Sequence, residues 1–399
     1  MYISTKVKEN LEKASWIRKM FEEGIRMKKE FGEGEVLDFS LGNPLMEPPD
    51  EFFEQLERIA GERKKGQHRY MPNTGFVETR QAVADQLSLE TGLPFTPDHI
   101  IMVCGAAGGL NVAIKTIIDP GDEVIILAPY FVEYLFYLEN HGARPVIAET
   151  GEDFLPDMDS IENALTRRTR AIIVNSPNNP TGRVYGEAFY RDLRDLLQKR
   201  ERETGRPVYL LADEPYQRLV YEGIKPPRAF QYVPNCISVT SHSKDLSIPG
   251  ERIGYMAVSP HCAGASEIIG GAAFCNRTLG FVNAPALAQR IVAGLQSLSV
   301  DVKDYEMKRD LLYGALKGIG YEIHKPEGAF YLFPKSPIPD DVQFVKILQR
   351  EKVLTVPGSG FGRPGYFRIA YCVEEKTIRR SVDSFKKAWE EAVGVNARL

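Results

Sequence analysis

The chain has 399 residues, of which 43% are hydrophobic and 26% are charged. A chain of this length can bury about three quarters of its unfolded surface, so it needs no disulfide or metal to fold. Lysine and arginine number 50 against 54 aspartate and glutamate, and a net charge of −4 argues against partners such as DNA, RNA or anionic membranes.

The first 24 residues are charged throughout and have no apolar core typical of a signal peptide. No apolar run in the sequence approaches the roughly 20 residues that a membrane span requires. The five cysteines include no Cys-x-x-Cys pair and the six histidines show no ligand spacing, so no disulfide framework or metal site is predicted. We therefore expect a soluble cytoplasmic protein with reduced thiols.

Between residues 100 and 258, short apolar runs alternate with amphipathic segments, which is typical of an α/β protein with a largely parallel, buried sheet. A helix is predicted from Leu110 to Ile118. The predicted strands are residues 101–104, 124–127, 171–174, 208–212, 237–240 and 253–258. The expected fold class is α/β, with a three-layer large domain around a mostly parallel central sheet.

The two ends of the chain differ from this middle part. They contain charged helical patterns, at residues 302–318 and 377–393, and shorter strands with polar flanks. We expect a smaller α+β domain assembled from residues 1–50 and 287–399, beside a large domain at residues 51–286. No internal repeat or low-complexity linker separates them.

Four predicted strands are each followed by residues that suit ligand binding, and open α/β sheets bind ligands beyond the carboxyl ends of their strands. After the first of them, Gly105-Ala-Ala-Gly-Gly109 lets backbone N–H groups and a helix N-terminus approach an anion. The others are followed by Asn175-Ser-Pro-Asn-Asn-Pro-Thr-Gly182, Asp213-Glu-Pro-Tyr216 and Ser241-His-Ser-Lys-Asp245, with Pro249-Gly-Glu-Arg252 beyond. Each motif alone is an ordinary turn, cap or surface charge, but together they predict one site with an anion cradle, a carboxylate, a phenol, an amide and a lysine.

These groups suit pyridoxal 5'-phosphate, which needs a phosphate anchor, a carboxylate against its ring nitrogen, hydrogen bonds to its phenolic oxygen, an aromatic face and a lysine. The chain resembles the class I/II aminotransferases, which are fold-type I pyridoxal-phosphate enzymes. The motifs that carry the resemblance run from Leu41-Gly-Asn-Pro44 through Ser241-His-Ser-Lys-Asp-Leu-Ser-Ile-Pro-Gly-Glu-Arg-Ile-Gly-Tyr255 to Phe367-Arg-Ile-Ala370. The resemblance implies a transaminase that moves an amino group from an L-amino acid to a 2-oxo acid by a ping-pong mechanism.

The same resemblance implies roles for the catalytic residues. Lys244 is the lysine that forms the Schiff base with the cofactor and then shuttles the proton. Asp213 pairs with the ring nitrogen, and Tyr216 and Asn179 hydrogen-bond the phenolic oxygen. This lysine must be able to be neutral, and we expect the charge of Arg252 and of a protonated cofactor ring to favour that form.

Further residues are assigned to the cofactor by the resemblance. Phe131 matches the aromatic residue that stacks on the ring, and Tyr70 the tyrosine that reaches the phosphate of the neighbouring subunit, which implies a homodimer with shared active sites. Many relatives carry a hydroxyl residue in the small-residue turn, where this chain has alanines. The groups expected to hold the phosphate are the backbone N–H groups of Gly105, Ala106 and Ala107 and the side chains of Ser241, Ser243 and Arg252.

On the substrate side, Arg368 matches the arginine that grips the α-carboxylate, and Gly42 the small residue of the segment that covers the substrate, with Asn179 beside them. Arg277 precedes Asn283-Ala-Pro285, as a second arginine does in relatives that use dicarboxylic acids. Two interpretations of Arg277 stay open, a contact to a distal carboxylate and a surface or interface position. The substrate is accordingly open between aspartate and a broad or aromatic range.

Three alternatives to a transaminase are weighed. The nearest is another fold-type I chemistry on the same scaffold, such as a C–S lyase or a decarboxylase. An NAD-dependent dehydrogenase that uses residues 105–109 is disfavoured because the Gly-x-Gly-x-x-Gly spacing is absent. A non-catalytic binding protein is disfavoured because Lys244, Asp213 and Arg368 are all present.

Overall fold

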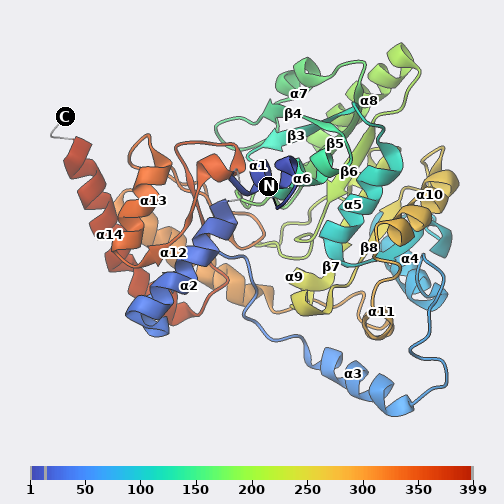
Figure 1. The fold of residues 1–399 in the computed structure, drawn as a ribbon, viewed down its shortest axis with the longest axis horizontal. Helices are drawn as coiled ribbons and strands as arrows, with labels where there is room; N and C mark the ends of the chain where they lie inside the picture. The colour runs from blue at the N-terminus through green and yellow to red at the C-terminus, as the bar shows by residue number, and fades with distance from the viewer. Residues whose placement is uncertain (1, 13–15, 397–399) are drawn as a thin grey trace.

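The chain forms a large and a small lobe in a computed structural model that describes residues 2–12 and 16–396 (Figure 1). The large lobe is built on a seven-stranded sheet of order β2-β8-β7-β6-β5-β3-β4, in which β8 is antiparallel to both neighbours and the other pairs are parallel. Its strands are β2 (Ile100–Val103), β3 (Glu123–Ala128), β4 (Arg144–Glu149), β5 (Thr169–Asn175), β6 (Tyr209–Asp213), β7 (Cys236–Ser241) and β8 (Gly254–Val258). The predicted α/β class with a mostly parallel central sheet is confirmed.

Both faces of this sheet are covered by helices. In β5, Ile172 and Val174 pack into the core on one face, while Ala171 and Ile173 pack into the core on the other. Because both faces are buried, the strands are apolar at nearly every position, which explains the continuous apolar runs of the sequence. One face carries α3 (Asp50–Glu62), α4 (Val77–Thr91), α7 (Met158–Ala164), α8 (Glu187–Thr204) and α11 (Ala286–Ala293), and the other carries α5 (Gly105–Ile117), α6 (Glu133–Asn140) and α10 (Ala265–Thr278).

Two features of the large lobe differ from the sequence-based expectation. Strand β4 is not predicted, because it lies at the sheet edge and exposes Arg144, Pro145 and Glu149. Helix α5 begins at Gly105, five residues before the predicted start at Leu110. A Cβ on Gly109 would lie 2.5 Å from the Val239 side chain, so this glycine lets the first turns of α5 pack directly on the sheet.

The small lobe combines both ends of the chain. Strand β1 (Leu37–Asp38) pairs in parallel with β10 (Val353–Leu354), and β12 (Phe367–Ala370) lies antiparallel between β11 (Val356–Pro357) and β9 (Tyr331–Leu332). The helices of this lobe are α2 (Trp16–Phe31), α12 (Val302–Ile319), α13 (Asp341–Arg350) and α14 (Glu375–Asn396). The helices predicted at 302–318 and 377–393 are confirmed as α12 and α14.

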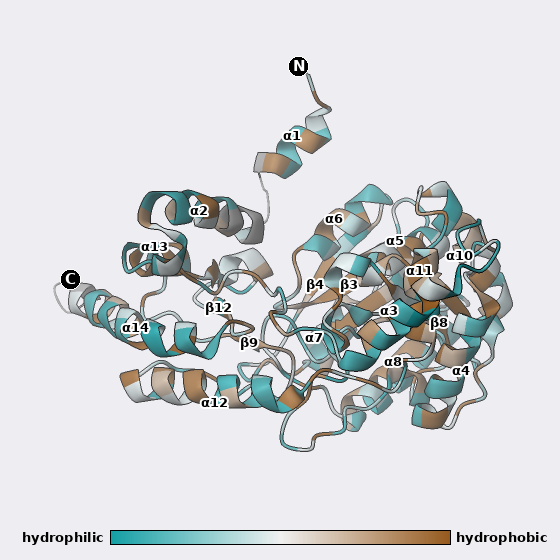
Figure 2. Cartoon of the chain, turned by 90° about the horizontal axis from the view of Figure 1, so that it is seen from below, coloured by the Kyte–Doolittle hydropathy of each residue, from teal (hydrophilic) through white to brown (hydrophobic). Residues whose placement is uncertain are grey.

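Two helices lie apart from this simple division. Helix α1 (Thr5–Glu12) stands away from the small lobe in Figure 2, and its Lys6 side chain donates to the Glu139 backbone oxygen of α6 at 2.9 Å. All but the first residue of helix α11 belong to the predicted small domain, which resumes at residue 287. The helix nevertheless packs against α3 and α4 of the large lobe. Within the described part of the chain, no helix is both long and apolar enough to cross a bilayer.

Candidate active site

A cavity of about 280 Å³ opens where the carboxyl ends of β5, β6 and β7 meet the small lobe. The parallel register sets Asn175 opposite Asp213 and Asp213 opposite Val239, so the residues that follow these strands gather at one edge. All predicted site residues line the cavity except Gly105 and Tyr70. Those that line it are Gly42, Ala106, Ala107, Phe131, Asn179, Asp213, Tyr216, Ser241, Ser243, Lys244, Arg252 and Arg368.

Lys244 lies on α9 (His242–Asp245), the short helix that follows β7. Its Nζ donates to the Gly42 carbonyl at 2.7 Å. Burial lowers the pKa of Lys244 to about 8; the Cys372 thiol opposes this shift, and the charges of Arg368 and Arg252 add to it. Half of the Lys244 side chains are therefore neutral amines near pH 8, the form that a nucleophile or a proton acceptor requires.

Asp213, the last residue of β6, is buried and lacks a positive partner. One carboxylate oxygen, Oδ2, accepts a short hydrogen bond from the Tyr134 hydroxyl of α6, while Oδ1 has no partner among the described residues. Burial raises the pKa of Asp213 to about 7; the Tyr134 hydrogen bond opposes the shift, and the charge of Glu214 adds to it. An N–H donor in the cavity would satisfy Oδ1 and stabilise the ionised carboxylate.

Arg368 reaches the cavity from β12 of the small lobe and is 2% exposed. Its Nη1 donates to Asn179 Oδ1 at 3.1 Å and its Nη2 to the Ser40 carbonyl at 2.6 Å, while Nε has no partner among the described residues. Burial lowers the pKa of Arg368. The guanidinium is thus held by neutral oxygens only, which leaves its positive charge available to an anionic ligand.

An anion cradle lies at the N-terminus of α5. The first N–H groups of a helix have no intrahelical partner, and here they belong to the turn of Ala106 and Ala107. Ser241 Oγ and Ser243 Oγ lie 2.6 Å apart beside them. Gly105 has a φ of 70°, and a Cβ there would lie 2.7 Å from Arg252 Nη2. Gly105 therefore does not line the cavity, but its lack of a side chain lets the Arg252 guanidinium approach this turn.

Phe131, Tyr70 and Arg277 lie in three different surroundings. Phe131 lines the cavity and meets the Tyr134 ring edge-on, with centroids 5.7 Å apart. Tyr70 is 90% exposed and lies outside the cavity of its own chain. Arg277 is exposed on α10, where its guanidinium lies 5.5 Å from the Phe274 ring centroid, and it does not line the cavity either.

Sequence reasoning missed several residues that line the cavity or touch its carboxylate. Asn175 donates from Nδ2 to the Asp213 carbonyl at 2.8 Å, and its position at the end of a predicted strand was the available signal. Tyr134 and Tyr137 of α6 gave no such signal, because nothing in the sequence shows which strand end a helix faces. Tyr331 comes from β9 of the small lobe, and its hydroxyl lies 2.8 Å from that of Tyr216.

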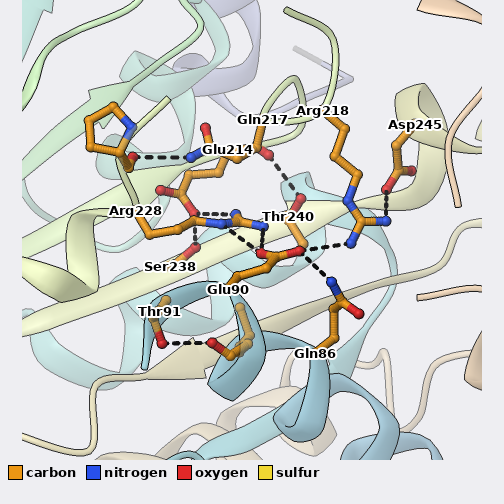
Figure 3. A network of polar contacts seen from close by, with 12 residues as sticks. Gln86, Glu90, Thr91, Glu214, Gln217, Arg218, Arg228, Ser238, Thr240 and Asp245 are labelled. Carbon is orange, nitrogen blue, oxygen red and sulfur yellow. Dashed lines mark hydrogen bonds and ion pairs between the residues drawn. The ribbon is translucent and has the colours of Figure 1, made fainter. Parts of the chain in front are cut away.

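Behind the cavity, the residues next to Asp213 and Lys244 join a buried charge network (Figure 3). Arg228 binds Glu214 at 3.1 Å and also Glu90 of α4, and Glu214 accepts from Ser238 at 2.7 Å. Further contacts extend the network from Arg218 to Glu90, 3.0 Å, and to Asp245, 4.0 Å. Asp213 thus lines the cavity while its neighbour Glu214 joins the network, and Lys244 and Asp245 on α9 divide in the same way.

The described residues hold no group of three or more histidine, cysteine, aspartate or glutamate side chains arranged to bind a metal. The polar groups of the cavity instead form two positively charged subsites. One contains Arg252, Ser241 and Ser243, and the other contains Arg368. Lys244 and Asp213 line the same cavity.

Comparison with known proteins gives the same family throughout. The family profile described as aminotransferase class I and II matches residues 34–385. A curated relative from Methanocaldococcus jannaschii, named probable aspartate aminotransferase, is 32% identical and aligns over 89% of this chain and 94% of its own length.

Solved structures are similar over almost the whole chain. The crystal structure of an aminotransferase from Eubacterium rectale superposes with a TM-score of 0.94 at 38% identity, covering 98% of this chain and 99% of that one. The aspartate aminotransferase of Thermus thermophilus, solved with maleate, superposes with a TM-score of 0.87 at 28% identity, covering 97% and 100%.

Proposed function

The chain belongs to the aminotransferase class I and II family and is a transaminase, and we propose that it transfers the amino group of L-aspartate to a 2-oxo acid with pyridoxal 5'-phosphate held at Lys244. One observation carries the proposal: Lys244, Asp213, Arg252 and Arg368 converge on one cavity from separate parts of the chain. These are the groups that the cofactor and an amino acid carboxylate require.

The residues present fit the cofactor. Asp213 Oδ1 is a buried acceptor without a donor, which suits a protonated ring nitrogen. The α5 N-terminus, Ser241, Ser243 and Arg252 would hold the phosphate, Tyr216 and Asn179 the phenolic oxygen, and Phe131 the ring face. When bound, the cofactor supplies the carbonyl carbon that takes up the amino group and a ring that withdraws electrons from the substrate α-carbon.

The protein residues supply positioning and proton transfer. Arg368, whose Nε has no partner among the described residues, binds the substrate α-carboxylate and so orients the α-carbon towards Lys244. Lys244 Nζ, whose pKa burial lowers, accepts the α-proton and returns it to the product. A protonated ring nitrogen against Asp213 would supply the partner that Oδ1 lacks and would keep the carboxylate ionised.

Aspartate is proposed as the amino donor because relatives over most of the chain carry that name and because a structural neighbour was solved with maleate, a dicarboxylate. In the described chain, the arginines that line the cavity are Arg252 and Arg368, both already assigned. We propose that a cation for the distal carboxylate comes from a second subunit, with Arg277, exposed on α10, as the candidate.

We propose a cytoplasmic homodimer in which the exposed Tyr70 reaches the phosphate in the neighbouring subunit. We also propose a discontinuous small domain, residues 1–50 and 287–399, beside a large domain, residues 51–286. The packing of α11 on α3 and α4 favours moving the second boundary beyond that helix.

The test is to incubate the purified protein with a panel of amino acids and 2-oxo acids. A yellow protein with turnover that depends on both partners, fastest with aspartate, is expected. Borohydride should fix the cofactor to Lys244, and Lys244→Arg should abolish both trapping and transamination. A colourless protein that cannot be trapped contradicts the proposal, whereas turnover without a 2-oxo acid acceptor indicates a lyase or a decarboxylase.

A further inference from the structure

We propose that Tyr331 is a further positioning residue of this site: its hydroxyl donates to Tyr216 and so strengthens the hydrogen bond that Tyr216 makes to the cofactor, while its ring supports Arg368. This inference rests on the proposed function, because it assumes that Tyr216 faces the phenolic oxygen of the cofactor.

The geometry joins the two halves of the site through one side chain. Tyr331 is 2% exposed and comes from the small lobe, whereas Tyr216 is 5% exposed and follows β6 of the large lobe. Their hydroxyl oxygens lie 2.8 Å apart. The Arg368 guanidinium stacks 4.7 Å from the centroid of the Tyr331 ring. Tyr331 therefore contacts both the residue assigned to the cofactor and the residue assigned to the substrate carboxylate.

The contact depends on a glycine from a third segment. A Cβ on Gly42 would lie 2.1 Å from the Tyr331 hydroxyl oxygen, far inside contact distance. Only a residue without a side chain lets Tyr331 occupy this position. The same Gly42 carbonyl accepts from Lys244, so this close approach lies at the centre of the site.

The direction of the hydrogen bond follows from what Tyr216 must do. If Tyr216 gives its proton to the cofactor oxygen, its own oxygen can only accept from Tyr331. Donors in series polarise one another, so the Tyr331 hydroxyl makes Tyr216 a better donor. With the cofactor bound, a stronger donor would withdraw electron density from the phenolic oxygen and would lower the proton affinity of the nitrogen that joins Lys244 to the cofactor.

The test is a pH titration of the visible absorbance of the holoenzyme, which reports protonation of that nitrogen without any turnover. Tyr331→Phe keeps the ring and removes the hydroxyl, and the midpoint should rise by about 0.1–0.7 pH units if the second donor contributes 10–30% of a charged hydrogen bond. Tyr216→Phe should raise the midpoint further. In the double variant the Tyr331→Phe change should add nothing, because its effect passes through Tyr216.

Two further variants keep the test sharp. Tyr321→Phe removes a buried hydroxyl that donates to the Phe385 carbonyl at 3.0 Å, away from the cavity, and should leave the midpoint unchanged. Gly42→Ala keeps both tyrosines but forces the Tyr331 hydroxyl aside, and should reproduce the upward shift.

The outcomes separate this inference from the function on which it rests. A midpoint that moves in Tyr216→Phe but stays fixed in Tyr331→Phe overturns the role of Tyr331 alone. Additive shifts in the double variant also overturn it, since Tyr331 would then act by another route. If neither single variant moves the midpoint, the assignment of Tyr216 to the phenolic oxygen is wrong and the inference falls with it.

Discussion

Replacing Asp213 by asparagine should stabilise the cofactor-free protein and at the same time weaken its hold on the cofactor. The carboxylate is buried, and one of its oxygens has no partner among the described residues. Its pKa rises from 3.8 to about 7 on folding. Below about pH 3 the group is neutral in both states and costs nothing, and as pH rises towards 7 only the unfolded chain ionises freely, so stability is lost over that window.

The size of this effect follows from the shift. At 1.36 kcal/mol per pH unit, ionised Asp213 costs the cofactor-free protein about 4 kcal/mol at pH 8 and about 1.7 kcal/mol at pH 5. In the variant, the buried NH2 group of the asparagine lacks a hydrogen-bond acceptor. This unsatisfied donor destabilises the folded state by about 1–2 kcal/mol at either pH. Asp213→Asn should therefore gain about 2–3 kcal/mol at pH 8 and almost nothing at pH 5.

The assay is urea unfolding of cofactor-free wild type and variant at both pH values. Asp245→Asn is the matched control, because Asp245 is also buried but has a partner in His242 at 3.2 Å and should be destabilised by the change. In the presence of cofactor the substitution should be unfavourable. Asp213→Asn should bind the cofactor about 10- to 100-fold more weakly, because a charged hydrogen bond is lost. A cofactor-free variant that is no more stable at pH 8, or a difference that does not change with pH, would refute the reasoning.

Arg368→Lys should raise the KM for amino acid and 2-oxo acid by about 100-fold, because an ammonium cannot bind a carboxylate in two places and leaves Asn179 Oδ1 unpaired; steady-state kinetics measure this. Arg252→Gln should weaken pyridoxal phosphate about 10- to 100-fold but leave binding of phosphate-free pyridoxal unchanged, as equilibrium titration can show. Glu90→Gln should lower the free energy of unfolding by about 2 kcal/mol in urea, since the buried Arg228 keeps only Glu214 as an anionic partner.

Each of these three predictions has a result that would contradict it. Equal KM values in wild type and Arg368→Lys would show that the α-carboxylate binds elsewhere. Equal loss of pyridoxal and pyridoxal phosphate binding in Arg252→Gln would point to a general distortion of the site. For Glu90→Gln, a stability like that of the control Glu78→Gln, whose exposed side chain lies 3.9 Å from Arg290, would mean that the network adds nothing.

The sheet could be predicted where it is buried on both faces. Strand β5 appears as a continuous apolar run because Ile172 and Ile173 pack on opposite sides of the same sheet. The edge strand β4 could not, since one of its sides faces solvent and Arg144 and Pro145 interrupt the pattern. The start of α5 was also missed, because glycine is a poor helix former and only the close packing of Gly109 on Val239 explains its place there.

The site could be predicted where chemistry follows a strand directly. Asp213, Ser241 and Lys244 come at the ends of predicted parallel strands, and parallel register brings such ends together. Tyr134 and Tyr331 could not be predicted, because each reaches the site from an element whose orientation depends on packing between layers or lobes. The short contact of Tyr134 with Asp213 spans 79 residues of chain.

The backbone carbonyls of Ser40 and Gly42 affect which ligands the site prefers. The Ser40 carbonyl already accepts from the Arg368 guanidinium, and the Gly42 carbonyl from the Lys244 amine. At Arg368 Nη2, a neutral ligand such as an amino acid amide would exchange one carbonyl for another and gain little there. A carboxylate gains the full difference between a dipole and a charge. These hydrogen bonds within the protein therefore contribute to ligand selectivity. A substrate has to bind Arg368 more strongly than the Ser40 carbonyl of the amino-terminal segment does.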